Sequence, residues 1–130
     1  GEEMLDVLNS AMTGHPIITT LHAFDNNSVP YRMARMIMMG KKNIDYDDAL
    51  KDVFYHFRFF VYLKKYQNNK GQIIRYISSI VESNENGEMN EIYSDDTSTK
   101  SYKKLSKSSL NLLNLDDISD NFAKYFVGKK

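Results

Sequence analysis

Residues 13–23, with the sequence TGHPIITTLHA, place two histidines around a short apolar run. A run of this length that is rich in isoleucine and threonine is typical of a buried strand in a mostly parallel sheet. We therefore predict a strand over residues 17–21. His22 would then lie at the carboxyl end of this strand, where open α/β sheets bind their ligands. His22 is on this ground a candidate site residue.

Helices are predicted on both sides of this strand. Apolar residues recur with helical spacing over residues 4–12, and Gly14 can adopt the left-handed backbone that ends a helix. A second helix is predicted to begin after Ser28, which is a suitable N-cap, with Pro30 tolerated in its first turn. It is expected to run through residue 39 and to stop near Gly40.

A third helix and a β-meander are predicted next. The helix should begin at Asp45. A period-two pattern then predicts strands over residues 59–66, 72–82 and 88–93, with turns at 67–71 and 84–87. The predicted apolar face of the third helix consists of Ala49, Leu50, Val53, Phe54 and Phe57.

The composition changes after residue 93. Residues 94–109 are rich in Ser, Asp, Thr and Lys, which predicts a polar linker or mobile loop. Residues 110–130 are expected to form a helical tail, because apolar residues share one helical face with acids early and lysines late. The predicted organisation is therefore a domain over 1–93, a linker over 94–109 and a tail over 110–130.

The overall composition narrows the function classes. The chain has 130 residues, 42% of them hydrophobic, with 17 basic and 17 acidic residues. This balance gives no electrostatic argument for a nucleic acid or an anionic membrane as a partner. The absence of cysteine excludes disulfides and thiolate zinc sites. No apolar run approaches the roughly 20 residues of a membrane span.

The words Thr-Gly-His at residues 13–15 and Thr-Leu-His-Ala at residues 20–23 resemble the histidine-box region of the secretion ATPases. Members of this superfamily are hexameric motors that power pilus assembly and type II and type IV secretion. Residues 3–12 resemble the helix that follows the family's Walker B segment, and residues 31–40 resemble the arginine-bearing helix of the CpaF-type pilus-assembly branch. A weaker resemblance continues to residue 80, and the last third of the chain resembles no family that we can name.

This resemblance implies an α/β fold: the C-terminal part of a RecA-like P-loop NTPase domain, with helices packed on a mixed sheet that ends in an antiparallel meander. It also implies a parent enzyme that uses ATP and Mg²⁺ to drive pilus assembly or protein export. The implied partners are other copies in a hexameric ring and the inner-membrane platform proteins of a pilus or secretion system, and no nucleic acid. The implied location is cytoplasmic, peripheral at the cytoplasmic face of the membrane.

Two departures from the family pattern qualify these expectations. The interval from His15 to His22 is one residue shorter than in CpaF-type members, so the branch (type II, type IV or the CpaF-type pilus) stays open. The chain also has no Gly-x-x-x-x-Gly-Lys-Ser/Thr phosphate loop; the nearest imitation, over residues 40–43, lacks the first glycine and the hydroxyl residue. We therefore expect a carboxyl-terminal piece without Walker A and Walker B, inactive alone and without a bound cofactor of its own.

The catalytic candidates are His22 and Glu3. The His22 imidazole can donate a hydrogen bond to a terminal phosphate oxygen or to the attacking water, and can report loss of the γ-phosphate. The alternative is a histidine whose ring nitrogens bond to nearby backbone. Glu3 matches the acid after the Walker B region and can act near magnesium, or it can be a first-turn glutamate favoured by the helix dipole.

Four further residues are candidates for contact with the nucleotide. His15 belongs to the same box, or else only closes the end of the preceding helix. Thr13 and Thr20 can orient the two histidine rings through their hydroxyl groups. Arg32 matches an arginine that the family places after its histidine box, where it can contact phosphate or a neighbouring subunit. No metal ligands are predicted within this chain.

A second function stays open. The chain can instead be a non-catalytic protein-interaction module derived from this family, which binds a partner through its aromatic and leucine-rich tail. A phosphate loop and a Walker B segment encoded in the same reading frame upstream would favour the motor.

Overall fold

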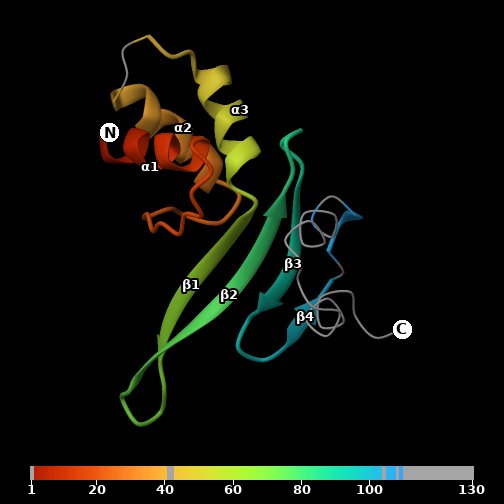
Figure 1. Ribbon diagram of the computed structural model, residues 1–130. Coiled ribbons are helices and arrows are strands. Elements are labelled where there is room, and N and C mark those ends of the chain that lie inside the picture. Colours follow the sequence, from red (N-terminus) through yellow and green to blue (C-terminus); the bar gives the residue numbers. More distant parts are fainter. Residues whose placement is uncertain (1, 41–42, 104, 108, 110–130) are drawn as a thin grey trace. The chain divides into compact units, whose positions relative to one another are not determined.

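The chain folds into three helices followed by four strands in a computed structural model that describes residues 2–40, 43–103, 105–107 and 109. It forms two compact units, a helical unit of Gly1–Arg58 with Ser83–Glu88 and a sheet unit of Phe59–Glu82 with Met89–Lys130. The elements (Figure 1) are α1 (Glu2–Met12), α2 (Val29–Gly40), α3 (Tyr46–His56), β1 (Phe59–Gln67), β2 (Ile73–Ser83), β3 (Met89–Asp95) and β4 (Lys100–Tyr102).

In the helical unit, α2 packs against both α1 and α3. Its buried residues recur at helical spacing, as expected for a helix whose apolar stripe faces a core. The three predicted helices are confirmed. The largest fully buried side chains in the described part of this unit are Leu8, Pro30, Met33, Ile37 and Val53.

The end of α1 is closed by a Schellman motif. The Gly14 N–H donates to the Ala11 carbonyl at 3.1 Å, and the His15 N–H donates to the Ser10 carbonyl at 3.3 Å. Gly14 has φ +85°, a conformation that costs a glycine little. The predicted helix end is therefore confirmed at this glycine.

The start of α2 is fixed by a reciprocal pair of side-chain bonds. The Ser28 N–H donates to Asp25 Oδ1 at 2.8 Å, and the Asp25 N–H donates to Ser28 Oγ at 3.3 Å. This pattern is that of a capping box with Asp25 in the N-cap position, and it closes the turn of residues 25–28 that leads into α2. The Ser28 carbonyl then accepts the Arg32 N–H at 3.0 Å, so the predicted start after Ser28 is confirmed.

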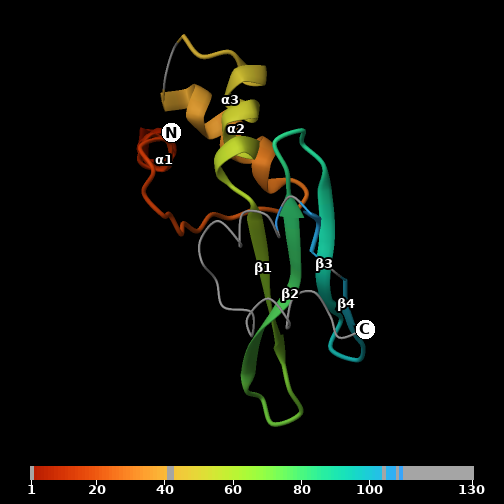
Figure 2. The same ribbon diagram turned by 45° about the vertical axis from the view of Figure 1, so that its right-hand side comes forward.

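The sheet unit contains a four-stranded antiparallel sheet with the order β1-β2-β3-β4 (Figure 2). The register pairs Phe60 with Val81, and a bulge follows Tyr62. The three strands predicted after the third helix are confirmed as an antiparallel meander. The observed fold is thus mixed α/β.

Two local predictions were wrong. Residues 17–21, expected to form a strand, have no secondary structure, because no described segment offers them a neighbouring strand. Part of the stretch predicted as a linker, residues 94–109, contains β4, which pairs Tyr102 with Tyr93 and so extends the sheet. The predicted tail, residues 110–130, lies outside the described residues.

Candidate functional site

Residues 13–23, which carry both candidate histidines, connect α1 to α2 in the helical unit. Within the described part of the chain, no backbone N–H or C=O of residues 16–23 makes a hydrogen bond. The burial of their side chains nevertheless alternates with period two, as in a β-strand with one face packed and the other exposed to solvent. The half-buried side chains are Ile17, Thr19, Leu21 and Ala23, and the exposed ones are Ile18, Thr20, His22 and Phe24.

His22 therefore lies on the open side of an extended segment, together with Thr20 and with Ile18, which is 99% exposed. An exposed imidazole on extended backbone is free to meet a ligand that approaches this side. The predicted hydroxyl contact between Thr20 and the His22 ring is not present among the described residues.

His15 is held by its neighbour Thr13. The Thr13 hydroxyl lies 2.8 Å from the Ser10 carbonyl and 2.9 Å from His15 Nδ1. A hydroxyl has one proton, so when Thr13 donates to Ser10, Nδ1 of His15 must carry a proton and donate to Thr13. Nε2 of the neutral ring is then an acceptor. This contact agrees with the interpretation of His15 as a helix-end residue and shows Thr13 orienting its ring.

Glu3 and Arg32 lie in the first turns of α1 and α2, and both are exposed. Across the residues that the structure describes, no hydrogen bond or ion pair joins either of them to His22. Of the six candidates, the structure therefore brings together only Thr13 and His15. If the remaining four act at one site, a bound ligand or another part of a larger protein has to unite them.

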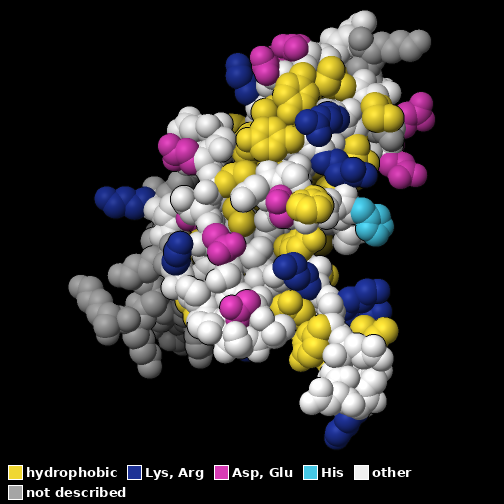
Figure 3. All heavy atoms as spheres, turned by 180° about the vertical axis from the view of Figure 1, so that it is seen from behind, with side chains coloured by type: hydrophobic (Ala, Val, Ile, Leu, Met, Phe, Trp, Pro, Cys, Tyr) yellow, Lys and Arg dark blue, Asp and Glu magenta, His cyan; other side chains and the backbone are white. Residues whose placement is uncertain are grey.

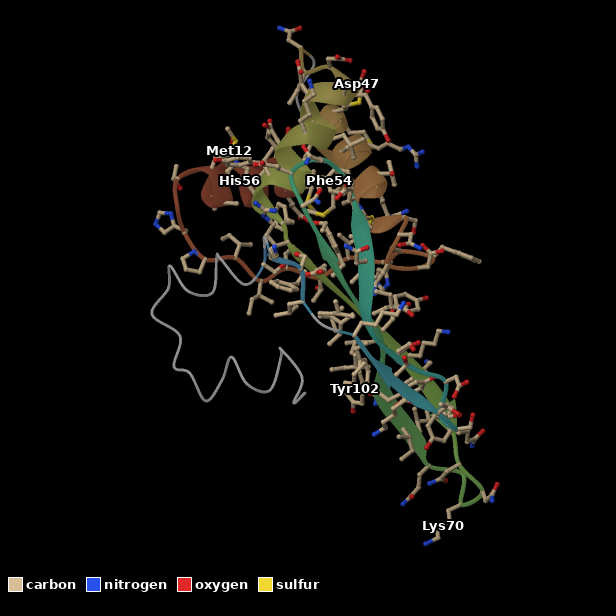
Figure 4. All side chains as sticks on the ribbon, turned by 90° about the vertical axis from the view of Figure 1, so that its right-hand side faces the viewer. Met12, Asp47, Phe54, His56, Lys70 and Tyr102 are labelled. Atoms are coloured by element: carbon tan, nitrogen blue, oxygen red, sulfur yellow. The ribbon has the colours of Figure 1, made fainter. Side chains whose placement is uncertain are left out.

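The third histidine, His56, ends α3, and Figure 4 labels it together with Met12 at the end of α1. Its ring meets the edge of the Tyr55 ring, with centroids 5.0 Å apart and planes at 77°. His56 is half-buried, and aromatic packing accounts for its position.

A polar cluster in the sheet unit was not predicted. Glu82 is 2% exposed, and its carboxylate accepts the Ser106 N–H at 2.8 Å and the Ser109 hydroxyl at 2.6 Å. The Ser106 hydroxyl lies 3.3 Å from the same carboxylate and accepts the Ser109 N–H at 3.2 Å. The sequence offered two signals for this cluster. One is an acid, Glu82, near the end of the apolar strand β2, and the other is a pair of serines three residues apart, Ser106 and Ser109. These bonds satisfy a buried carboxylate and so have a structural role.

The turn between β3 and β4 shifts the pKa of two side chains. Backbone and side-chain donors from Thr99 and Ser98 hold the pKa of the Asp96 carboxyl below its usual value. Burial raises the pKa of the Tyr93 phenol, and the negative charge of Asp95 raises it further. The Asp96 shift arises from hydrogen bonds within the turn and the Tyr93 shift mainly from burial on β3, so the two do not mark a catalytic pair.

Within the described ranges, no group of three or more His, Cys, Asp or Glu side chains could hold a metal ion. None of the helices described is both long and apolar enough to span a bilayer.

Comparison with known proteins gives one weak similarity. No protein-family model and no solved structure matches the chain. The chain is similar to an uncharacterized protein of Bacillus anthracis, with 27% identity over 90 residues, which cover 63% of this chain and 20% of the relative. The chain therefore matches about a fifth of the length of that relative.

Proposed function

We propose that this chain is the C-terminal portion of a secretion or pilus-assembly motor ATPase, and that it supplies the parent enzyme with its histidine box. In the parent, ATP and Mg²⁺ are held mainly by residues outside this chain. The finer fold assignment, the end of a RecA-like domain, belongs to the same proposal.

The observation that carries the proposal is the extended segment of residues 16–23. It has the side-chain alternation of a strand without the backbone ladder of one. Backbone donors and acceptors in an apolar segment are normally paired with other backbone. A strand of the parent's sheet on each side would pair this segment and leave His22 at its carboxyl end.

Three further features support the proposal. The two histidine words sit on one connection between two helices, in the order seen in the secretion ATPases. Glu3 and Arg32 are exposed on these helices, so both are accessible to a ligand. The relative from Bacillus anthracis is about five times as long as the part that matches, which suits a chain that resembles one portion of a larger protein.

In the proposed mechanism, His22 donates a hydrogen bond to the terminal phosphate or to the attacking water, and the attached segment moves when that contact disappears. Arg32 neutralises phosphate charge or contacts a neighbouring subunit in a hexameric ring. Glu3 would act near a magnesium ion held by other residues of the parent. Thr13 keeps the His15 ring in one orientation.

ATP turnover by the complete parent tests this proposal. The His22→Ala variant should lose most of its turnover, while its circular dichroism spectrum stays that of the wild type. The matched control is His56→Ala, which removes a histidine of the same unit that lies outside the box. Unchanged turnover in His22→Ala, or an upstream reading frame without a phosphate loop, would overturn the proposal.

The isolated chain gives a second test. Because it has no phosphate loop, its affinity for ATP should be weaker than a Kd of about 1 µM, which corresponds to about 8 kcal/mol. Micromolar binding in calorimetry would show that this chain holds the nucleotide with its own residues.

A further inference from the structure

The hairpin of β1 and β2 exposes an apolar face. Register partners in a sheet lie side by side on the same face, and the register pairs Val61 with Ile80 and Leu63 with Ile77. Of these side chains, Leu63 is 66% exposed, Val61 51% and Ile77 40%. Phe59 and Ile73 belong to the same face and are also exposed. We call Phe59, Val61, Leu63, Ile73, Ile77 and Ile80 the hairpin face.

Positive charge is concentrated on the same hairpin. Residues 59–81 contain four cations, Lys64, Lys65, Lys70 and Arg75, and no acidic residue, although the whole chain is neutral. Lys65 and Arg75 are direct register partners, so two like charges lie side by side on the hairpin face. Such a pair destabilises a sheet unless an anion lies against it. Figure 3 shows hydrophobic and basic side chains over the outer part of this hairpin.

The one carboxylate at the inner end of the face is buried. Glu82 is the register partner of Phe59, but it is 2% exposed and accepts hydrogen bonds from Ser106 and Ser109. Its carboxylate is therefore not exposed to an approaching surface. Apart from Gln67, the partner of Ile73, the exposed side chains on this side of the hairpin are apolar or cationic.

We propose that the hairpin face binds the surface of an anionic lipid bilayer. Aliphatic side chains enter the boundary between headgroups and acyl chains, and nearby lysine and arginine side chains extend to the anionic headgroups. Each such cation near the surface raises the partition coefficient about fivefold. A single-stranded nucleic acid fits less well, because its bases stack on aromatic rings and the exposed face is mainly aliphatic. This inference does not depend on the ATPase proposal.

The absence of native cysteine allows a sharp test. The Leu63→Cys variant of the full chain is labelled with an environment-sensitive fluorophore such as NBD. Without vesicles, its emission should be that of a dye in water. With vesicles of phosphatidylcholine and 30% phosphatidylglycerol the emission should shift to the blue, and with phosphatidylcholine alone it should not. The control is the Ile18→Cys variant, labelled on a 99% exposed isoleucine of the helical unit, which should keep the emission of a dye in water throughout.

Charge variants complete the test through vesicle co-sedimentation of the unlabelled chain. The double variant Lys65→Gln/Arg75→Gln should bind the anionic vesicles about 30-fold more weakly. The matched control Lys100→Gln/Lys103→Gln removes two exposed cations outside the hairpin and should bind as the wild type does.

Three results would overturn the inference. One is blue-shifted emission of the Leu63 label without vesicles, which would show that another part of the chain or a second copy occupies the face. Another is equal binding to neutral and anionic vesicles, or no binding to either. The third is an equal loss of binding in the hairpin variant and its control.

Discussion

Removal of the Phe54 ring should destabilise the helical unit more than any surface change on the same helix. Phe54 is 5% exposed, and its ring meets the edge of Tyr31, with centroids 6.3 Å apart and planes at 81°. The turn after β2 lies against the ring as well, because a Cβ built on Gly87 would be 3.5 Å from Phe54 Cε2. Figure 4 labels Phe54 on α3.

The size of the effect follows from these contacts. Truncation of a buried phenylalanine to alanine costs about 3–5 kcal/mol, and the lost edge-to-face pair is worth about 1 kcal/mol of that total. A unit of roughly 60 residues has a stability of about 3–9 kcal/mol. The Phe54→Ala variant should therefore lose about 4 kcal/mol, which leaves it marginally folded or unfolded at 25 °C.

Urea unfolding followed by circular dichroism at 222 nm measures this loss, because α1, α2 and α3 all belong to this unit. The matched control is Tyr55→Ala, the next residue along α3, whose side chain is 60% exposed. It should change the free energy of unfolding by less than about 1 kcal/mol. A loss below about 1 kcal/mol in Phe54→Ala, or equal losses in both variants, would refute the assigned core.

Three further changes have defined outcomes. Gly14→Ala should lower the unfolding free energy by about 1 kcal/mol in thermal melts, because its φ of +85° strains an alanine although no atom blocks the Cβ; an unchanged melting temperature would contradict the helix end described above. The lowered folded pKa of Asp96 means that its carboxylate stabilises the turn above the unfolded pKa of 3.8, and that this stabilisation is lost as pH falls through the folded pKa. The NMR signal of the Thr99 amide should show this loss in acid, and the same acid transition in Asp96→Asn would disprove it. Glu82→Ala should speed amide exchange at Ser106 by tenfold or more, because charge-assisted bonds worth about 1.5–3 kcal/mol each are removed, whereas protection equal to the wild type would show that the carboxylate does not hold this segment.

Much of the fold could be predicted because its signals are local. The third helix has its N-cap residue and its apolar face within thirteen residues, from Asp45 to Phe57. The meander has turns rich in asparagine and glycine, and its strands alternate with period two. Gly14 ends α1 for a reason visible in the sequence, since only glycine adopts a positive φ at little cost.

The failures concern features that depend on partners distant in the sequence. The alternation in residues 17–21 is real, but a strand also needs a neighbour, and the described chain offers none. β4 is three exposed residues without an apolar pattern, so nothing marked it as a strand. The Glu82 cluster joins residues 24 and 27 positions apart, and such a contact cannot be predicted from spacing.

In the candidate site, too, the local contact could be predicted and the distant ones could not. The Thr13–His15 contact spans two residues and was suggested by the sequence. Whether His22, Glu3 and Arg32 meet depends on the ligand or on the rest of a larger protein. The proposal for this site therefore depends on the extended segment that carries His22.

Amide hydrogen exchange over residues 16–23 tests most directly the claim that this extended segment pairs with strands only in the complete parent. In the isolated chain, these amides should exchange at nearly the rate of an unfolded peptide, since they make no backbone hydrogen bonds within the described residues. In the complete parent, the same amides should slow by at least about 100-fold, as expected when they enter a sheet. Fast exchange in the parent, or strong protection already in the isolated chain, would contradict the account.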